Sequence, residues 1–359
     1  MSVRAKFTKQ FSGFTLDAVL ELPGKGVSAI FGDSGSGKTT LLRCVAGLER
    51  ADSGFLEVNG ALWQDDARGV FVPTHKRALG MVFQESSLFP HLSVRANLEF
   101  GWKRVAPAQR QVAFDEAVAL LDIGHLLERM PANLSGGERQ RAAIVRALLT
   151  SPALLLMDEP LASLDSRRKQ EILPYLERLH DELAIPVLYV SHSSNEVARL
   201  ADMLVLLERG KVAAAAPLEQ LLPRLDLPFA HSAEASVVIP ATVAAHDDGY
   251  GLSRVEFDGG AFWVGQVARP LGSRVRVNVA ARDVSIALAR PHDSSILNSV
   301  AVKVVAIDHD QSNSSLIQLA TGNGETRLLA RVMRKSAVEL GLAPGMAVHA
   351  QVKGVALLK

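Results

Sequence analysis

The segment GDSGSGKTT, residues 32–40, constrains the fold of this chain more than any other part of its sequence. Its spacing is G-x-x-x-x-G-K-[ST], and it lies between an apolar run at 27–31 and a largely apolar run at 41–46. This order predicts a strand, a glycine-rich loop and a helix. The glycines allow several backbone N–H groups to point toward one anion, and the helix dipole adds to the attraction. We therefore expect an α/β domain that binds a polyphosphate at this loop.

Side chains of the same loop have predictable roles toward a nucleotide. Lys38 is expected to reach the β- and γ-phosphates, and the Thr39 hydroxyl is expected to bind Mg²⁺. An adenine ring needs a flat apolar surface, which either Phe11 or Phe14 can supply; a purely structural place in the core is the alternative for both. The predicted nucleotide-binding residues are Gly32, Asp33, Ser34, Gly35, Ser36, Gly37, Lys38, Thr39, Thr40 and Phe11.

The composition limits the classes of protein to which the chain can belong. Its 359 residues are enough for two or three domains, and 48% hydrophobic with 21% charged residues is ordinary for a globular protein. Neither a run of about 20 apolar residues nor an apolar N-terminal leader is found, so a cytoplasmic protein is expected. The single cysteine, Cys44, excludes an internal disulfide, and a net charge of +1 gives no reason to expect nucleic acid as a partner.

Three further apolar runs end in polar residues. The runs at 79–83, 153–157 and 186–190 are typical of buried parallel strands. Polar residues at the carboxyl ends of such strands face the ligand crevice of an α/β sheet. We therefore expect the residues that follow these runs to lie beside the phosphate-binding loop.

These strand ends deliver an amide, two carboxylates and an imidazole. Asp158 occupies the position of a metal-organising carboxylate, which leaves Glu159 to accept a proton from water. Gln84 is expected to bind Mg²⁺ or the attacking water, and the place of His192 favours a catalytic role. The predicted metal ligands are thus Thr39, Gln84 and Asp158, and the predicted catalytic residues are Glu159, His192 and Gln84.

A helical pattern covers about 86–150 and predicts a helical subdomain inserted in the sheet domain. Near its end, LSGGE at 134–138 has two interpretations. Ser135 and Glu138 have the spacing of a capping box at the start of a helix. The paired glycines also leave backbone N–H groups at the helix N-terminus that can receive an anion. Both interpretations can hold together.

The sequence contains, in this order, GDSGSGKT, Gln84, LSGGE, LLLMDE, Asp165 and His192. This ordered set resembles the ATPase subunits of ATP-binding-cassette (ABC) transporters. The resemblance implies a head-to-tail homodimer. In it the signature residues of one copy close on the γ-phosphate held by the other copy's Lys38. The signature residues are Ser135, Gly136, Gly137 and Glu138, and Glu138 stands where this family more often has Gln.

The same resemblance implies roles for the strand-end residues. It makes Glu159 the general base and His192 the residue that positions the γ-phosphate and water. It also places Asp165 in the loop that follows the carboxylates, the D-loop. ATP and Mg²⁺ are the cofactors that this family implies.

Two longer stretches narrow the resemblance to the ATPases of molybdate importers. They are FQESSLFPHLSVRANL at 83–98 and SHSSNEVARLAD at 191–202. ATPases of sulfate, iron or polyamine importers share the first stretch loosely and the second less well. The resemblance implies a peripheral subunit at the cytoplasmic face of the cell membrane, where it works with an integral-membrane permease dimer and a periplasmic or extracellular molybdate-binding protein.

Two alternatives remain beside molybdate import. An importer for another oxyanion, such as sulfate, or for tungstate belongs to the same class. A soluble cassette ATPase acting on ribosomes or DNA belongs to a different class. Proteins of that second class more often carry two cassettes and strongly basic arms, and this sequence has one cassette and no such arm.

The C-terminal third of the sequence has a β pattern. We expect an ABC nucleotide-binding domain over 1–222, a linker over 223–236 and a regulatory β domain over 237–359. Strict alternation, as at 274–279, indicates a small OB-like barrel, with two related halves as one arrangement. Few aromatics and 13 Lys and Arg against 10 Asp and Glu, a net +3, argue against an oligonucleotide-binding barrel.

Residues of about 293–359 resemble the molybdate-binding fold appended to molybdate-importer ATPases. The resemblance is carried by SSILN at 294–298 and LGLAPG at 340–345. In the family motif an arginine commonly stands where this chain has Leu297. The remaining candidate oxyanion ligands are Ser295, Asn298 and Lys353.

Overall fold

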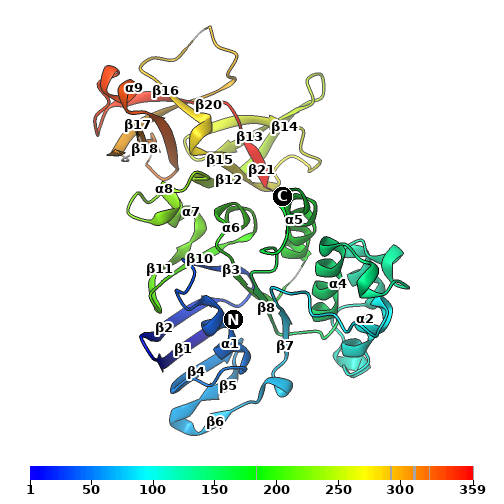
Figure 1. Ribbon diagram of the computed structural model, residues 1–359. Helices are drawn as coiled ribbons and strands as arrows, with labels where there is room; N and C mark the ends of the chain where they lie inside the picture. The colour runs from blue at the N-terminus through cyan, green and yellow to red at the C-terminus, as the bar shows by residue number, and fades with distance from the viewer. Residues whose placement is uncertain (183, 292, 310–312, 323, 359) are drawn as a thin grey trace. The chain divides into compact units, whose positions relative to one another are not determined.

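The computed structural model describes residues 1–358 except 183, 292, 310–312 and 323 (Figure 1). The chain divides into two compact units, Met1–Ala216 and Pro217–Lys359. This boundary falls a few residues before the predicted end of the first domain at 222. Each unit is described by itself below.

The first unit is built on an eleven-stranded sheet with the order β6-β5-β4-β1-β2-β11-β10-β3-β9-β8-β7 (Figure 1). The strands are β1 (Ser2–Phe11), β2 (Phe14–Pro23), β3 (Gly26–Phe31), β4 (Ser53–Val58), β5 (Ala61–Asp65), β6 (Val70–Phe71), β7 (Leu79–Val82), β8 (Leu154–Asp158), β9 (Pro186–Val190), β10 (Met203–Glu208) and β11 (Lys211–Pro217). Strands β10, β3, β9, β8 and β7 are parallel neighbours, whereas β2, β1, β4, β5 and β6 pair antiparallel. The loops after β3, β9, β8 and β7 therefore leave the same edge of the sheet.

Sequence patterns explain the two halves of this sheet. Every residue of β8 and β9 is buried, as expected for central parallel strands covered on both faces. Strand β2 instead alternates buried and exposed residues along most of its length. The turn at Asn59-Gly60 joins β4 to β5, and both residues have positive φ, 48° and 86°.

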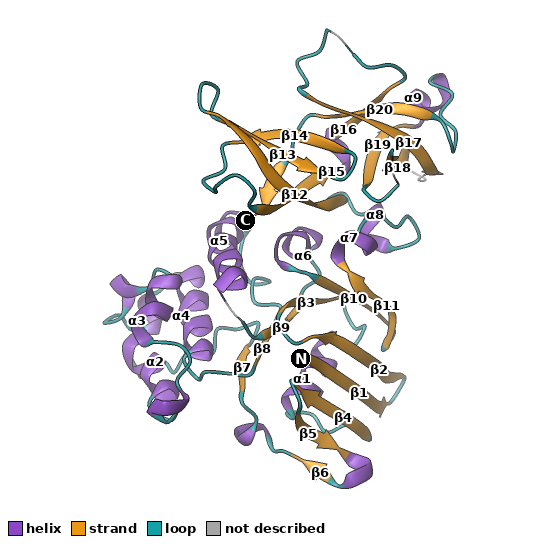
Figure 2. Ribbon diagram, turned by 180° about the vertical axis from the view of Figure 1, so that it is seen from behind, coloured by secondary structure: helices purple, strands orange, loops and turns teal. Residues whose placement is uncertain are grey.

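The described part of the first unit contains six α-helices. They are α1 (Lys38–Ala46), α2 (Val94–Trp102), α3 (Phe114–Leu120), α4 (Gly136–Leu148), α5 (Ser166–Glu182) and α6 (Ser194–Leu200). Figure 2 shows α2, α3 and α4 gathered beside β7 and β8, within the region predicted to be a helical subdomain. A shared apolar core joins these helices to the parallel strands through residues such as Leu98, Leu121 and Ile144.

Helix α1, which follows the phosphate-binding loop, is anchored at its C-terminal end by Arg77. The guanidinium donates to the carbonyl oxygens of Cys44 (3.3 Å) and Val45 (2.6 Å), to Val72 O (2.8 Å) and to Gln64 Oε1 (3.3 Å). Arg77 is only 5% exposed, and burial lowers its pKa to about 10, so it remains charged at neutral pH. A cation at a helix C-terminus satisfies the last carbonyls and complements the helix dipole.

Replacing Arg77 by Met is expected to lower the free energy of unfolding by about 2–4 kcal/mol, because several buried acceptors lose their donor. Urea denaturation measures the effect. Arg50 is the matched control, since its guanidinium lies 5.1 Å from the same Phe71 ring that Arg77 contacts at 5.1 Å, yet Arg50 is exposed. Equal losses in Arg77→Met and Arg50→Met would show that the aromatic contact, and not the helix anchor, carries the effect.

The second unit contains two five-stranded antiparallel sheets, ordered β14-β13-β12-β15-β21 and β16-β20-β17-β18-β19. Its strands are β12 (Ser236–Asp247), β13 (Leu252–Phe257), β14 (Gly260–Gly265), β15 (Arg274–Ala280), β16 (Val284–Ala287), β17 (Asn298–His309), β18 (Ser314–Thr321), β19 (Arg327–Met333), β20 (Ala347–Val352) and β21 (Ala356–Leu358). Its helices are α7 (Leu218–Leu221), α8 (Pro228–His231) and α9 (Arg334–Glu339). One apolar core is shared by both sheets.

The two sheets have a common plan. Each contains a strand of 12 residues, β12 or β17, whose pairing with the next strand along the chain is interrupted by a register shift, at Val243/Ala245 and at Val304/Ala306. Each long strand also pairs on its other side with a later strand, β15 or β20. This arrangement agrees with two related halves.

The segment 223–236, expected to be a linker, is instead folded into the second unit. It contains α8, and its Ala230 and Ala235 belong to the buried core. Arg331 Nη2 donates to Ala230 O (3.0 Å) and to Ser232 O (2.8 Å). Pro228 begins the helix at a position where proline is tolerated, so this proline has a structural role.

Candidate nucleotide-binding site

The phosphate-binding loop occupies the predicted place between β3 and α1 in the first unit. A cavity of about 350 Å³ opens beside it, lined by the loop and by Phe11, Phe14, Gln84 and Glu159. The structure thus brings the predicted site residues Phe11, Gln84 and Glu159 together with the loop.

Gly37, the last glycine of the loop, is required by its conformation and its contacts. Its φ is 102°, and a Cβ atom there would lie 2.7 Å from Phe14 Cζ. Phe14 thus packs against the loop, with its ring centroid 5.9 Å from that of Phe11. Phe11 is 42% exposed, so of the two it has more free surface for an adenine ring.

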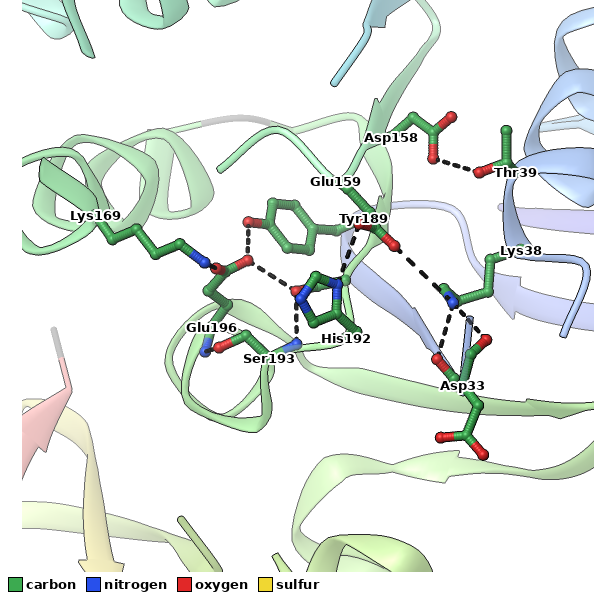
Figure 3. Close-up of polar contacts among 12 residues, drawn as sticks. Asp33, Lys38, Thr39, Asp158, Glu159, Lys169, Tyr189, His192, Ser193 and Glu196 are labelled. Atoms are coloured by element: carbon green, nitrogen blue, oxygen red, sulfur yellow. Dashed lines mark hydrogen bonds and ion pairs between the residues drawn. The ribbon is translucent and has the colours of Figure 1, made fainter. Parts of the chain in front are cut away.

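Lys38 is buried at the N-terminus of α1, with 5% of its surface exposed. Its ammonium donates to Gly32 O (2.8 Å) and Asp33 O (2.9 Å), which folds the side chain back over its own loop (Figure 3). Glu159 Oε1 lies 3.9 Å from the same nitrogen. A buried ammonium held only by carbonyls and one carboxylate is well suited to a phosphate anion.

Thr39 and Asp158 are in direct contact, although 119 residues separate them in the chain. The Thr39 hydroxyl donates to Asp158 Oδ1 at 3.0 Å. Burial of Asp158 raises the pKa of its carboxyl, the Thr39 hydrogen bond lowers it, and the neighbouring Glu159 charge raises it. A hydroxyl and a carboxylate converging on one point are oxygen ligands of the kind that Mg²⁺ prefers, so these residues fit that ion.

Glu159 lies between the loop lysine and the predicted histidine. Its backbone has a positive φ of 44°, and its N–H donates to Val190 O at 3.0 Å. The side chain joins His192 Nδ1 through Oε2 at 3.1 Å and faces Lys38 through Oε1 (Figure 3). A carboxylate held between a cation and an imidazole at a phosphate site is placed to receive a proton from water.

The capping box predicted at the start of α4 is confirmed. Ser135 Oγ accepts from Glu138 N (3.2 Å), and Ser135 N donates to Glu138 Oε2 (2.6 Å). The Ser135 hydrogen bond is the main cause that lowers the pKa of Glu138. Among the described residues that line the cavity, none belongs to the signature set 135–138.

Asp165 caps the next helix, α5, instead of lining the cavity. Its Oδ1 accepts from Arg168 N at 3.0 Å, and this contact is the main cause that lowers the pKa of Asp165. The predicted D-loop residue therefore fixes the position at which α5 begins.

A group of polar residues behind His192 was not singled out from the sequence. It consists of Lys169, Tyr189, Ser191, Ser193 and Glu196, which are joined by hydrogen bonds and one ion pair. The spacing of Ser193 and Glu196 is that of a capping box, which was the available signal. The serine does cap α6, but the Glu196 carboxylate turns away to other partners.

The proposed oxyanion ligands of the second unit are not brought together as predicted. Asn298 is buried, and its amide is engaged with Trp263, accepting from the backbone N–H (2.7 Å) and donating to the carbonyl (3.0 Å). Both polar atoms of this amide therefore already have a protein partner. Ser295 and Lys353 are exposed, and no contact between them is found in the described part of the unit.

The phosphate-binding loop beside the paired carboxylates Asp158 and Glu159 defines a nucleotide-hydrolysing site. A family model described as ABC transporter matches residues 17–162. A second model, the TOBE domain, matches residues 294–358, so the predicted fold class of both units is confirmed. A solved structure, cbiO1 from Clostridium perfringens, described as part of the ABC transporter complex cbiONQ, has a TM-score of 0.53 and 25% identity, covering 61% of this chain and 89% of that one.

Two relatives match the chain over nearly its full length. Molybdenum import ATP-binding protein ModC of Aromatoleum aromaticum is 61% identical over 358 residues, covering 100% of this chain and 94% of the relative. ModC 1 of Azotobacter vinelandii is 58% identical, covering 99% of this chain and 98% of the relative. The chain belongs to the ModC family of ABC transporter ATP-binding proteins. In the described part of the chain, no helix is both long and apolar enough to cross a membrane.

Proposed function

We propose that this chain is the ATP-hydrolysing subunit of an importer for molybdate. The observation that carries the proposal is the 61% identity to a molybdenum import ATP-binding protein across both units, including the C-terminal one. An importer for tungstate or for another oxyanion such as sulfate is the alternative. The nucleotide site supports the ATPase role independently of the ion that is transported.

The residues around the loop have distinct roles in this proposal. The loop 32–40 binds the phosphates, with the Lys38 ammonium moving from Gly32 O and Asp33 O to the β- and γ-phosphates. Thr39, Asp158 and Gln84 hold Mg²⁺, which when bound neutralises charge on the phosphate oxygens. Phe11 supplies the exposed ring on which adenine stacks.

Hydrolysis then requires a water molecule beside the γ-phosphate and a base to receive its proton. The water oxygen forms a bond to the γ-phosphorus, the bond to the β–γ bridging oxygen breaks, and ADP leaves with that electron pair. Glu159 takes the proton from the water, and His192, bonded to its Oε2, keeps the carboxylate oriented. The water-excluded setting that this step needs comes from closure of a second copy on the site.

The second copy is expected to contribute its signature residues. The first N–H groups of a helix have no partner within the helix, and those of α4 begin at the paired glycines 136 and 137. The head-to-tail homodimer uses them to bind the γ-phosphate held by the partner's Lys38. A permease dimer in the membrane and an extracytoplasmic molybdate-binding protein complete the importer, with this subunit on the cytoplasmic face.

The test is an ATPase assay of the chain reconstituted with its permease in lipid vesicles. Molybdate-loaded binding protein is expected to raise ATP turnover several-fold, as coupling energies of roughly 1–3 kcal/mol allow. Sulfate-loaded and tungstate-loaded proteins are compared in parallel. Equal stimulation by sulfate, or none by molybdate, would contradict the proposed substrate, while loss of basal ATP hydrolysis in all samples would contradict the ATPase role itself.

A further inference from the structure

The carboxylate of Glu196, on the first turn of α6, lies directly behind the loop that carries His192. Glu196 is 3% exposed, although no step of the proposed hydrolysis uses it. A buried carboxylate is costly unless it is paired and hydrogen-bonded. The hydrogen-bond partners of the Glu196 carboxylate therefore indicate which part of the structure it stabilises.

Three donors satisfy the carboxylate of Glu196 (Figure 3). The Tyr189 hydroxyl and the Ser191 hydroxyl each donate to Oε2 at 2.8 Å, and Lys169 Nζ lies 2.9 Å from Oε1. Burial, followed by the charge of Glu196, raises the pKa of Tyr189 well above its usual range, so this hydroxyl stays protonated as a donor. The carboxylate thus has defined partners on β9, on the following loop and on α5.

The residues on both sides of His192 are fixed by these contacts. Ser191 bonds Glu196 directly, and its Oγ also accepts from Ser193 N at 3.0 Å. Ser193 Oγ in turn accepts from Glu196 N at 3.4 Å. Hydrogen bonds therefore hold the backbone on both sides of His192, and the imidazole is free to form its hydrogen bond with Glu159 Oε2.

Lys169 connects the same carboxylate to the segment after the D-loop. Its side chain leaves the first turn of α5, and its backbone N–H donates to Asp165 O at 3.0 Å. Asp165 caps that helix through Arg168 N. The Lys169–Glu196 ion pair therefore fixes the position of the start of α5 relative to the His192 loop.

We propose that Glu196 is a positioning residue for hydrolysis: it orients His192 toward Glu159 and, through Lys169, couples that orientation to the start of α5. This proposal rests on the proposed role of Glu159 and His192. In this proposal Glu196 contacts neither ATP nor the attacking water, and it acts only through His192.

A second ion pair on the same two helices provides a matched control. Arg199 of α6 lies 2.6 Å from Glu177 of α5, and the side-chain exposures, 23% and 4%, equal those of Lys169 and Glu196. This pair also ties α5 to α6, but Glu177 has no described contact with the loop of residues 191–193. If the buried charges served only to stabilise the fold, replacing Glu196 or Glu177 would have the same effect on turnover.

The first experiment compares Glu196→Gln with Glu177→Gln in the full-length chain. Glu196→Gln is expected to lower kcat roughly tenfold with ATP binding unchanged, since a small misplacement of a positioned group is costly to the chemical step. Glu177→Gln is expected to leave kcat unchanged. The imidazole NMR resonances of His192 in the nucleotide-free protein are expected to shift in the first variant alone. Equal kcat losses, or an unmoved His192 signal in Glu196→Gln, would overturn the proposal.

The second experiment measures Glu196→Gln in a His192→Ala background. If Glu196 acts only through His192, the residual turnover of His192→Ala is unchanged by the second substitution, whereas independent roles give additive losses. Wild-type turnover in His192→Ala alone would contradict the proposed role of His192, on which this inference rests. Low turnover in His192→Ala with a further, additive loss in the double variant would contradict this inference alone. If Glu196→Gln does not fold, Lys169→Met and Lys169→Arg replace it, with loss of kcat expected in the first and recovery in the second; equal activity of the two would overturn the proposal.

Discussion

Glu159→Gln is expected to lower ATP turnover by about 10²-fold or more, the order associated with loss of a positioned base, while MgATP binding is retained. The amide preserves the size of the side chain and can still bond His192, but it cannot take a proton from water. Turnover is measured by phosphate release, and binding by fluorescence titration with a nucleotide analogue. Because hydrolysis is blocked and binding is not, a stable ATP-bound dimer is expected to accumulate in gel filtration.

The neighbouring carboxylate provides the contrast for this prediction. Asp158→Asn is expected to weaken Mg²⁺-dependent ATP binding as well as turnover, because Asp158 contacts Thr39 at the expected metal position and not His192. Near wild-type turnover in Glu159→Gln would show that Glu159 is not the base. Loss of ATP binding in both variants would show that the two carboxylates form one binding unit without separate roles.

The sequence predicted those parts of the site that depend on local order. The phosphate-binding loop is one continuous segment, and the capping box of Ser135 and Glu138 spans four residues. Asp158 and Glu159 follow a strand whose unbroken apolar run required a central place in the sheet. Since parallel strands end at one edge, the convergence of these residues followed from topology alone.

Contacts between distant segments were not predictable in the same way. Arg77 reaches the end of α1 across more than thirty residues, and nothing in its own neighbourhood distinguishes it from an exposed arginine. Lys169 and Glu196 likewise meet only because α5 and α6 pack together. The contact of Asn298 with Trp263 was not predicted although a signal existed: Asn298 is in phase with Val300 and Val302, the buried face of β17, and so its amide faces the inside of the fold.

Mixed dimers of Lys38→Ala chains and Ser135→Arg chains are expected to recover ATP turnover that neither variant has alone. If each site combines the Lys38 of one copy with the Ser135 of the other, the mixed dimer contains one site with both wild-type residues. Turnover of about half the wild-type value is expected if the two sites act independently. The physical reason is that the N-terminus of α4 can bind a γ-phosphate only when it faces a loop other than its own, since its signature residues do not line the described cavity of the same chain.

The reciprocal combination serves as the control, because it contains the same two substitutions in the opposite arrangement. A chain carrying both Lys38→Ala and Ser135→Arg is mixed with wild-type chain, and the mixed dimer is isolated with two affinity tags. Head-to-tail sites then each contain one substituted residue, so no turnover is expected, whereas sites formed within one chain would leave the wild-type copy active. Activity in this second dimer together with none in the first would establish that Ser135 acts on the ATP of its own chain, and the head-to-tail arrangement would be wrong.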